Sequence, residues 1–124
     1  MRVILSAMSG VPLYEQIVEQ ARQQIMTGEL AAGAMLPSLR ALAGELRVSL
    51  ITTTRAYNDL AAEGLIVNVP GKGSFVARID PDEARRSSLE RARAGLRQIV
   101  ARTRHTRLVS LEELTAMLAE EWER

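Results

Sequence analysis

The side chains that could do chemistry in this chain are hydrogen-bond donors and positive charges, with no catalytic set among them. The sequence has no cysteine, and its one histidine, His105, lies in a basic stretch without a second metal ligand at suitable spacing. The glutamates near the C-terminus lie on an expected helix surface and do not suggest a paired-carboxylate site for acid–base catalysis. No nucleophile arrangement is present either. We therefore expect no enzymatic activity, no metal ion and no cofactor.

The polar and small residues between positions 38 and 73 are instead of the kinds that contact nucleic acid. Serine, threonine, arginine and lysine side chains bond to phosphates and base edges, and apolar side chains contact thymine methyl groups. Glycine lets the backbone approach a phosphate closely, because it adopts positive φ angles without strain. The residues that we expect at such an interface are Arg40, Ser49, Leu50, Thr52, Thr54, Arg55, Gly71, Lys72 and Gly73.

Two short helices are predicted to position the first of these residues. Ser38 can cap a helix whose apolar residues recur at three- and four-residue spacing up to Leu46. Ser49 can cap a second helix, which is expected to run to about Glu63 and to end at Gly64. The face of the second helix that we expect to point inward carries Val48, Thr53, Ala56, Tyr57 and Leu60. The face that we expect to point outward carries Leu50, Ile51, Thr52, Thr54, Arg55 and Asn58.

A β-hairpin is predicted to follow these helices. Residues 65–69 and 74–77 are β-prone, and Pro70, two glycines and Lys72 join them; Met35 and Leu36 can add a short third strand. Two helices joined by a tight turn and followed by a glycine-tipped hairpin, or wing, are the plan of a winged helix-turn-helix, which binds DNA. Ile51, on the outward face of the second helix, is expected to contact a thymine methyl group. The alternative is that Ile51 packs against the wing or against a partner.

The segment before these helices is predicted to contain one more helix. Residues 1–11 are expected to form an arm or an edge strand. Pro12 suits the first turn of a helix, because its missing N–H costs nothing there. Four apolar residues, from Leu13 to Ile25, then recur every fourth position along one face, and Gly28 is expected to end the helix.

Two amphipathic helices are predicted after residue 79. Asp80 and Pro81 suit the start of the first, and Ser110 with Glu113 forms a capping box at the start of the second. Apolar stripes this narrow do not close a core alone. A homodimer would cover them, and the alternative is that both helices fold back on the preceding domain. The residues that we expect to dimerise are Leu89, Ala92, Leu96, Ile99, Leu111, Leu114, Leu118 and Trp122.

Composition and charge set the limits of this interpretation. A length of 124 residues allows one small domain with an appendage, and a net charge of +1 does not by itself indicate a nucleic-acid binder. Residues 81–107 carry eight arginines against three acids, and residues 108–124 carry five glutamates against one arginine, so the two helices can pair by charge in a dimer. No apolar run approaches the ~20 residues of a membrane span. The first eight residues fall short of a secretory signal, so we expect a cytoplasmic protein.

The residues that compose these elements resemble the GntR family of bacterial transcription regulators. The resemblance covers roughly residues 10–78, and the short helical tail is similar to the YtrA subgroup of that family. The matching residues, in order, are Pro12-Leu13-Tyr14-Glu15-Gln16-Ile17, Gly28-Glu29-Leu30, Leu36-Pro37-Ser38-x-Arg40-x-Leu42-Ala43, Val48-Ser49, Thr52, Arg55-Ala56-Tyr57, Leu60, Glu63-Gly64-Leu65-Ile66 and Gly71-x-Gly73-x-Phe75-Val76.

The resemblance implies that Arg40 reaches DNA, where the residues alone would also allow a solvated surface arginine. It implies repression of transcription and control of transport operons. Arg55 matches a common family arginine, which either touches a phosphate or braces the fold. Members of the family often have arginine where this chain has Leu50 and Thr54, so two guanine or phosphate contacts are expected to be missing here.

Together these observations predict a mainly α fold with a small β-hairpin wing. Residues 1–78 are expected to form a winged helix-turn-helix DNA-binding domain, and residues 79–124 a helical dimerisation tail. The predicted function is a homodimeric repressor that binds an inverted-repeat operator in double-stranded DNA. The alternatives are a winged-helix module that binds another protein, or a sensor whose small-molecule effector binds at the dimer interface.

Overall fold

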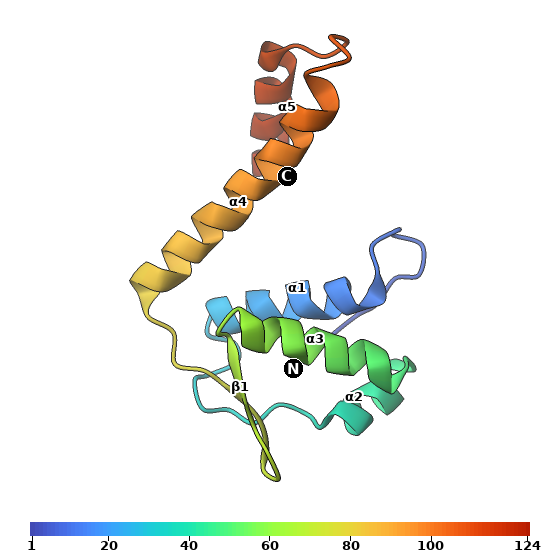
Figure 1. Cartoon of the computed structure of the whole chain (residues 1–124), viewed down its shortest axis with the longest axis vertical. Helices are drawn as coiled ribbons and strands as arrows, with labels where there is room; N and C mark the ends of the chain where they lie inside the picture. Colours follow the sequence, from blue (N-terminus) through green and yellow to red (C-terminus); the bar gives the residue numbers. More distant parts are fainter. The chain divides into compact units, whose positions relative to one another are not determined.

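The computed structural model describes all 124 residues, which form five helices and one two-stranded antiparallel hairpin. They fall into two compact units, Met1–Pro81 and Asp82–Arg124, which are described separately below. The mainly helical fold with a hairpin wing is as predicted. The elements, in order, are α1 (Leu13–Met26), α2 (Leu39–Leu46), α3 (Leu50–Ala62), β1 (Ile66–Val69), β2 (Gly73–Val76), α4 (Pro81–Thr103) and α5 (Leu111–Glu123) (Figure 1).

The turn between α2 and α3 is set by its caps. The Ser38 hydroxyl accepts a hydrogen bond from the N–H of Ala41, and the Ser49 hydroxyl accepts one from the N–H of Thr52, both at 3.1 Å. Each serine thereby pairs a donor that the first turn of its helix leaves free, as predicted. Arg47 ends α2 in the left-handed conformation, with φ at 57°, so the chain reverses within a few residues and α3 begins immediately.

The core of the N-terminal unit is aliphatic and is centred on α3. Ala56, Tyr57 and Leu60 of α3 are buried against the apolar face of α1, including Ile17 and Ala21. The inward face of α3 is therefore as predicted, although Val48, just before the helix, is only partly buried. The other buried apolar residues are Val18, Ile25, Leu36, Leu42, Ala43, Leu65, Ile66 and Val76.

The wing is a short antiparallel hairpin with a third chain segment beside it. β1 and β2 pair from Ile66 opposite Val76 to Val69 opposite Gly73. Met35 forms an isolated bridge to Phe75, and the N–H of Leu36 donates to the backbone oxygen of Ser74 at 2.8 Å. The segment therefore pairs with the wing, as the sequence suggests, but it does not form a third strand. Gly73 has φ at 128°, a backbone conformation that residues with a side chain rarely adopt, so the backbone favours glycine here.

The N-terminal arm is held by side chains of α1 rather than by a strand. Gln16, Gln20 and Gln24 lie one helical turn apart, and each amide pairs with the backbone N–H and C=O of one arm residue, namely Ser6, Ile4 and Arg2 respectively. These six hydrogen bonds range from 2.5 to 3.0 Å. The alternate arm residues Met1, Val3 and Leu5 pack against the core.

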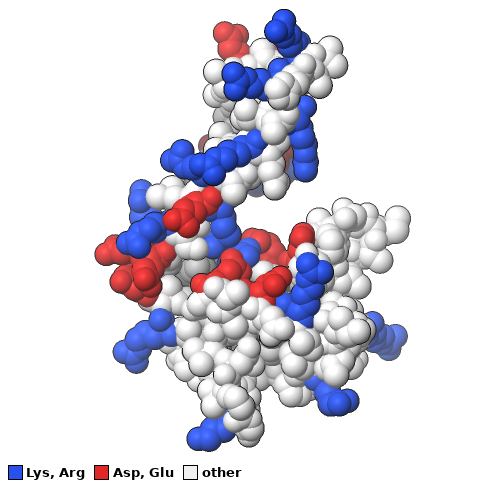
Figure 2. Space-filling model, in the orientation of Figure 1, with Lys and Arg blue, Asp and Glu red and all other residues white.

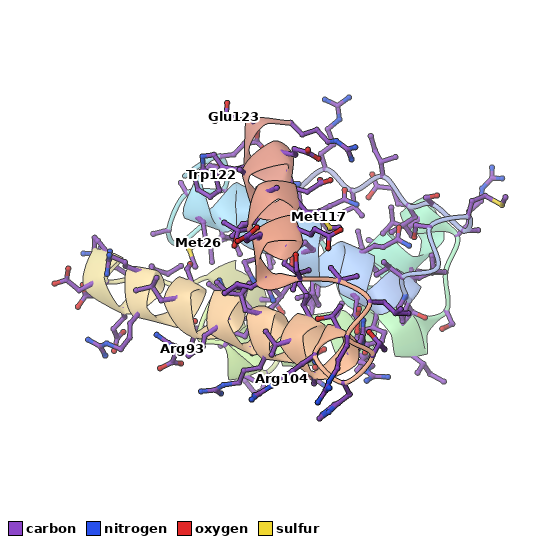
Figure 3. The ribbon with its side chains drawn as sticks, turned by 90° about the horizontal axis from the view of Figure 1, so that it is seen from above. Met26, Arg93, Arg104, Met117, Trp122 and Glu123 are labelled. Carbon is purple, nitrogen blue, oxygen red and sulfur yellow. The ribbon has the colours of Figure 1, made fainter.

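The C-terminal unit consists of two helices with exposed apolar stripes. The predicted capping box of α5 is present: the Ser110 hydroxyl accepts from the N–H of Glu113, and the Glu113 carboxylate accepts from the N–H of Ser110. Neither α4 nor α5 buries a residue. In Figure 3, Arg93 and Arg104 project from one side of α4, while Met117 and Trp122 lie on α5.

No helix of the protein is both long enough and apolar enough to cross a bilayer.

Candidate nucleic-acid interface

A groove lies between the wing and the start of α3. It encloses about 660 Å³ of open space, and its walls come from the first turn of α2, the outer side of α3 and the hairpin tip. The structure therefore brings together residues that the sequence nominates from three separate segments, namely Arg40, Leu50, Gly71, Lys72 and Gly73.

The charge around this groove favours an anionic partner. Arg40 and Lys72 are exposed on its walls, and no aspartate or glutamate lines it. Four acids of the N-terminal unit instead line one depression between α1 and the C-terminal half of α3, namely Glu15, Glu19, Asp59 and Glu63 (Figure 2). Arg22 is bound there, with its guanidinium paired to both Glu19 and Glu63. The two sides of the unit thus differ in charge, although its total charge is near zero.

Tyr57 fixes one wall of the groove to the core. Its hydroxyl donates to the backbone oxygen of Pro37 at 2.7 Å, immediately before the Ser38 cap of α2. Because the phenol is almost fully buried, its pKa is raised to about 12. Thr53 adds a second link, since its buried hydroxyl lies 3.1 Å from the backbone oxygens of both Leu39 and Leu50. Together these bonds hold the first turns of α2 and α3 at a fixed distance.

The outward face of α3 has polar groups that are largely paired within the helix. The Thr54 hydroxyl donates to the backbone oxygen of Leu50 at 2.7 Å. The Ser49 and Thr52 hydroxyls lie 2.9 Å apart and share a hydrogen bond. Leu50 and Ile51 beside them are exposed, with 38% and 80% of their surface accessible. The outward positions are therefore as predicted, but the structure pairs hydroxyls that the sequence leaves free.

The side chain of Arg55 packs against α1. Its guanidinium carbon is 3.7 Å from the centroid of the Tyr14 ring on α1, which is a cation–π contact. This geometry corresponds to the bracing role that the sequence allows as an alternative for Arg55. Arg55 does not line the groove, whereas it does line a shallow depression along the outward face with Ile51 and Thr54.

Two asparagines line the groove, and of these the sequence points only to Asn58, on the expected outward face of α3. Asn58 lies on the outward face of α3 beyond Leu50, and Asn68 lies on β1, where its amide oxygen accepts from the Ser74 hydroxyl at 2.6 Å. The helical period places Asn58 outward, but only the hairpin register brings Asn68 and Ser74 to the same wall. An isolated asparagine in a strand carries no signal that would identify it from sequence alone.

Comparison with known protein families gives one match over this unit. The model described as "Bacterial regulatory proteins, gntR family" matches residues 13–76, which span α1 through the wing. This segment contains every residue of the groove.

Several curated proteins are similar over the same region. The HTH-type transcriptional regulator Rv1152 of Mycobacterium tuberculosis is 30% identical over 77% of this chain and 79% of its own length. The HTH-type transcriptional repressor NagR of Bacillus subtilis is 36% identical over 64% of this chain, which spans 33% of NagR. The HTH-type transcriptional repressor YtrA of Bacillus subtilis is 35% identical over 56% of this chain, which spans 53% of YtrA. The chain thus spans less than two thirds of the length of NagR and of YtrA.

Solved structures are similar in fold. A transcriptional antiterminator from Listeria monocytogenes EGD-e superposes over 100% of this chain and 91% of its own, with a TM-score of 0.73 and 28% identity. YtrA from Sulfolobus acidocaldarius superposes over 74% of this chain and 97% of its own, with a TM-score of 0.60 and 37% identity. The DNA-binding domain of AraR in complex with operator ORR3 covers 62% of this chain and 93% of its own, with a TM-score of 0.53 and 30% identity.

Proposed function

This chain belongs to the gntR family of bacterial regulatory proteins, and we propose from this premise that it is a DNA-binding repressor of transcription that acts as a homodimer. The observation that carries the proposal is the groove between α3 and the wing. It presents Arg40 and Lys72 beside the start of α3 and is lined by no acid. A helix in this setting is suited to enter the major groove while the wing follows the sugar–phosphate backbone.

The proposed roles follow from the position of each residue. Arg40 and Lys72 contact phosphates on either side of α3. Backbone N–H groups near Gly71 and Gly73 approach the backbone or the minor groove at the wing tip, because no side chain blocks the approach. Ser49 holds the first turn of α3 in shape, and Leu50, Thr52 and Thr54 face the base edges, while Arg55 supports α3 from α1.

Repression is proposed because of what the relatives are called. NagR and YtrA of Bacillus subtilis are both described as transcriptional repressors. The AraR domain, which has a related fold, has been solved with an operator bound. A repressor needs no surface beyond its operator-binding groove and its dimer contact, because it acts by occupying the DNA.

The homodimer is proposed because of the C-terminal unit, residues 82–124. Large apolar side chains on α4 and α5 are about half exposed or more, including Leu96 at 48%, Leu118 at 57% and Trp122 at 85%. A second copy would cover these stripes, and the arginines of α4 would lie within reach of the glutamates of α5. The operator is then an inverted repeat whose half-sites lie about one helical turn apart, roughly 34–36 Å.

The experiment that tests this proposal is a selection of bound sequences from a pool of random duplexes, with the promoter region upstream of the protein's own gene as a second probe. The expected result is an enriched sequence with two-fold symmetry that binds more tightly than random duplex. The Arg40→Ala variant should bind both this sequence and random duplex more weakly, because it loses a phosphate contact. The Arg124→Ala variant is the matched control, because it removes the same charge at a residue whose side chain is 81% exposed in the tail.

Each component of the proposal has its own contradicting result. An enriched sequence without symmetry would contradict the homodimer on an inverted repeat. A pool that shows no enrichment, together with equal and weak binding of promoter and random duplex, would contradict DNA recognition. The exposed Ile51 would then indicate a module that binds another protein.

A further inference from the structure

The outward face at the start of α3 is mostly hydrocarbon. Leu50 and Ile51 occupy its first turn, with Ile51 80% exposed, and both border the depression on this face. An isoleucine this exposed has no packing role within its own chain. Ile51 is the second residue of α3, next to Leu50, which lines the groove. We therefore expect the partner of Ile51 to be the molecule that enters the groove.

The hydroxyl groups of the same face have little donor capacity left. Thr54 has one hydroxyl hydrogen, and it is donated to the backbone oxygen of Leu50. The Ser49 and Thr52 hydroxyls share one hydrogen between their oxygens, so one of the two remains free to donate outward. Three hydroxyls thus offer a single free hydrogen.

The first two turns of α3 also hold no free cationic side chain. Arg55 is the only arginine or lysine on the helix, and its guanidinium lies on the ring of Tyr14. The bidentate pair that arginine or lysine makes with guanine is therefore not available from this face. Asn58, two turns from the start of the helix, is the amide that remains near it.

We infer that α3 recognises the methyl groups of thymine through Leu50 and Ile51, and that this hydrocarbon contact, rather than hydrogen bonding from the first turn, carries most of its sequence preference. The inference rests on the proposed function, since it requires duplex DNA in the groove. Among the four bases only thymine presents a methyl group in the major groove. Arg40 and Lys72, on the walls of the groove, supply the charge that holds the duplex there without selecting a sequence.

The test replaces single thymines of the selected operator by deoxyuridine. This change removes the methyl group and leaves base pairing and phosphate charge intact. At one or two positions in each half-site we expect the dissociation constant to rise about fourfold per methyl, the factor that corresponds to one buried methyl-sized group. A 5-methylcytosine–guanine pair at the same position should bind more tightly than an unmethylated cytosine–guanine pair.

Variants of the protein link the effect to the two side chains. Leu50→Ala and Ile51→Ala should each bind the thymine operator more weakly and discriminate less between thymine and deoxyuridine at one position. Val67→Ala is the matched control, because Val67 is a 50% exposed apolar residue of the wing that does not line the groove. It should keep the full discrimination. Circular dichroism confirms that each variant is folded.

The outcomes separate this inference from the function on which it rests. Tight, specific binding that is unchanged by every deoxyuridine substitution would overturn the inference and leave the proposed function standing. Discrimination that survives in both Leu50→Ala and Ile51→Ala would also overturn it. Failure to bind any duplex specifically would overturn both, and binding of another protein through Ile51 would then explain the exposed face.

Discussion

At the scale of single residues, Tyr57 connects the core to the DNA-binding groove. Its ring is buried in α3, and its hydroxyl bonds to the backbone just before α2. The sequence predicts that Tyr57 faces inward, but a helical period cannot show which backbone oxygen accepts the hydrogen bond of its hydroxyl. That bond joins the middle of α3 to the residue before the cap of α2, 20 residues away in the chain.

The raised pKa of Tyr57 predicts a loss of stability at high pH. Burial favours the neutral phenol, so the stabilisation is fully present below the unfolded pKa of 10.0 and is lost as pH rises through about 12. The expected loss is roughly 2–3 kcal/mol over this interval. Urea unfolding at several pH values measures it. In Tyr57→Phe the decline should be smaller, and an equal decline in both proteins would contradict the assignment.

The contact between Arg55 and Tyr14 predicts a role in stability. Tyr14→Leu removes the ring face, and we expect a cost of about 0.5–1 kcal/mol, whereas Tyr14→Phe should cost less because a ring remains. Thermal or urea unfolding measures both. Arg55→Ala should lower stability while reducing operator affinity less than Arg40→Ala does. If Arg55→Ala leaves stability unchanged and abolishes binding, Arg55 is instead a DNA contact.

At the scale of elements, the helices follow closely from local signals. Ser38, Ser49 and Ser110 each cap the helix that the sequence assigns to them, because a serine before an apolar period is a specific start signal. The wing follows from its glycines and β-prone flanks. These signals act over a few residues, so they are visible in the sequence without knowledge of the tertiary structure.

The N-terminal arm shows where local signals end. The sequence leaves an arm and an edge strand as alternatives, and the structure has an extended arm bound to glutamine side chains of α1. Glutamines at four-residue spacing look like an ordinary solvated helix face. Their role emerges only when an extended segment, which exposes backbone groups at every second residue, lies along that face.

Replacing one of these glutamines should loosen the arm locally. Gln20→Ala removes both hydrogen bonds to Ile4, so the amide of Ile4 should exchange with solvent several-fold faster. Hydrogen exchange followed by NMR measures this rate. Gln23→Ala, at an exposed position of the same helix, is the control and should leave the arm unchanged. Equal exchange in wild type and Gln20→Ala would show that apolar packing alone holds the arm.

At the scale of the whole molecule, the apolar stripes of α4 and α5 predict the assembly state. Leu96→Asp places a charge in the proposed dimer contact, and we expect the protein to become monomeric while its helices remain. Light scattering after size-exclusion chromatography measures the mass. Ala101→Asp, on the opposite side of α4 by helical period, is the control and should stay dimeric. A monomeric wild-type protein at micromolar concentration would contradict the proposal.

The candidate site, like the N-terminal arm, was only partly predictable, because some of its contacts depend on tertiary structure. Residue type and spacing nominate Arg40, Leu50 and Lys72, and the fold brings them to one groove. Whether a threonine hydroxyl points to its own helix or to a base depends on a side-chain torsion, and the stacking of Arg55 depends on the packing of α1 against α3. Neither is encoded in a short stretch of sequence.

The most direct test of DNA recognition by the groove is the salt dependence of operator binding in wild type and Arg40→Ala. If Arg40 binds a phosphate as proposed, its removal should weaken binding to operator and random duplex alike. It should also reduce the slope of log K against log salt by about one for each phosphate that is no longer neutralised, whereas Arg124→Ala should match wild type. An Arg40→Ala protein with wild-type affinity and slope would contradict the account, and would do so most clearly if Arg93→Ala on α4 abolished binding instead.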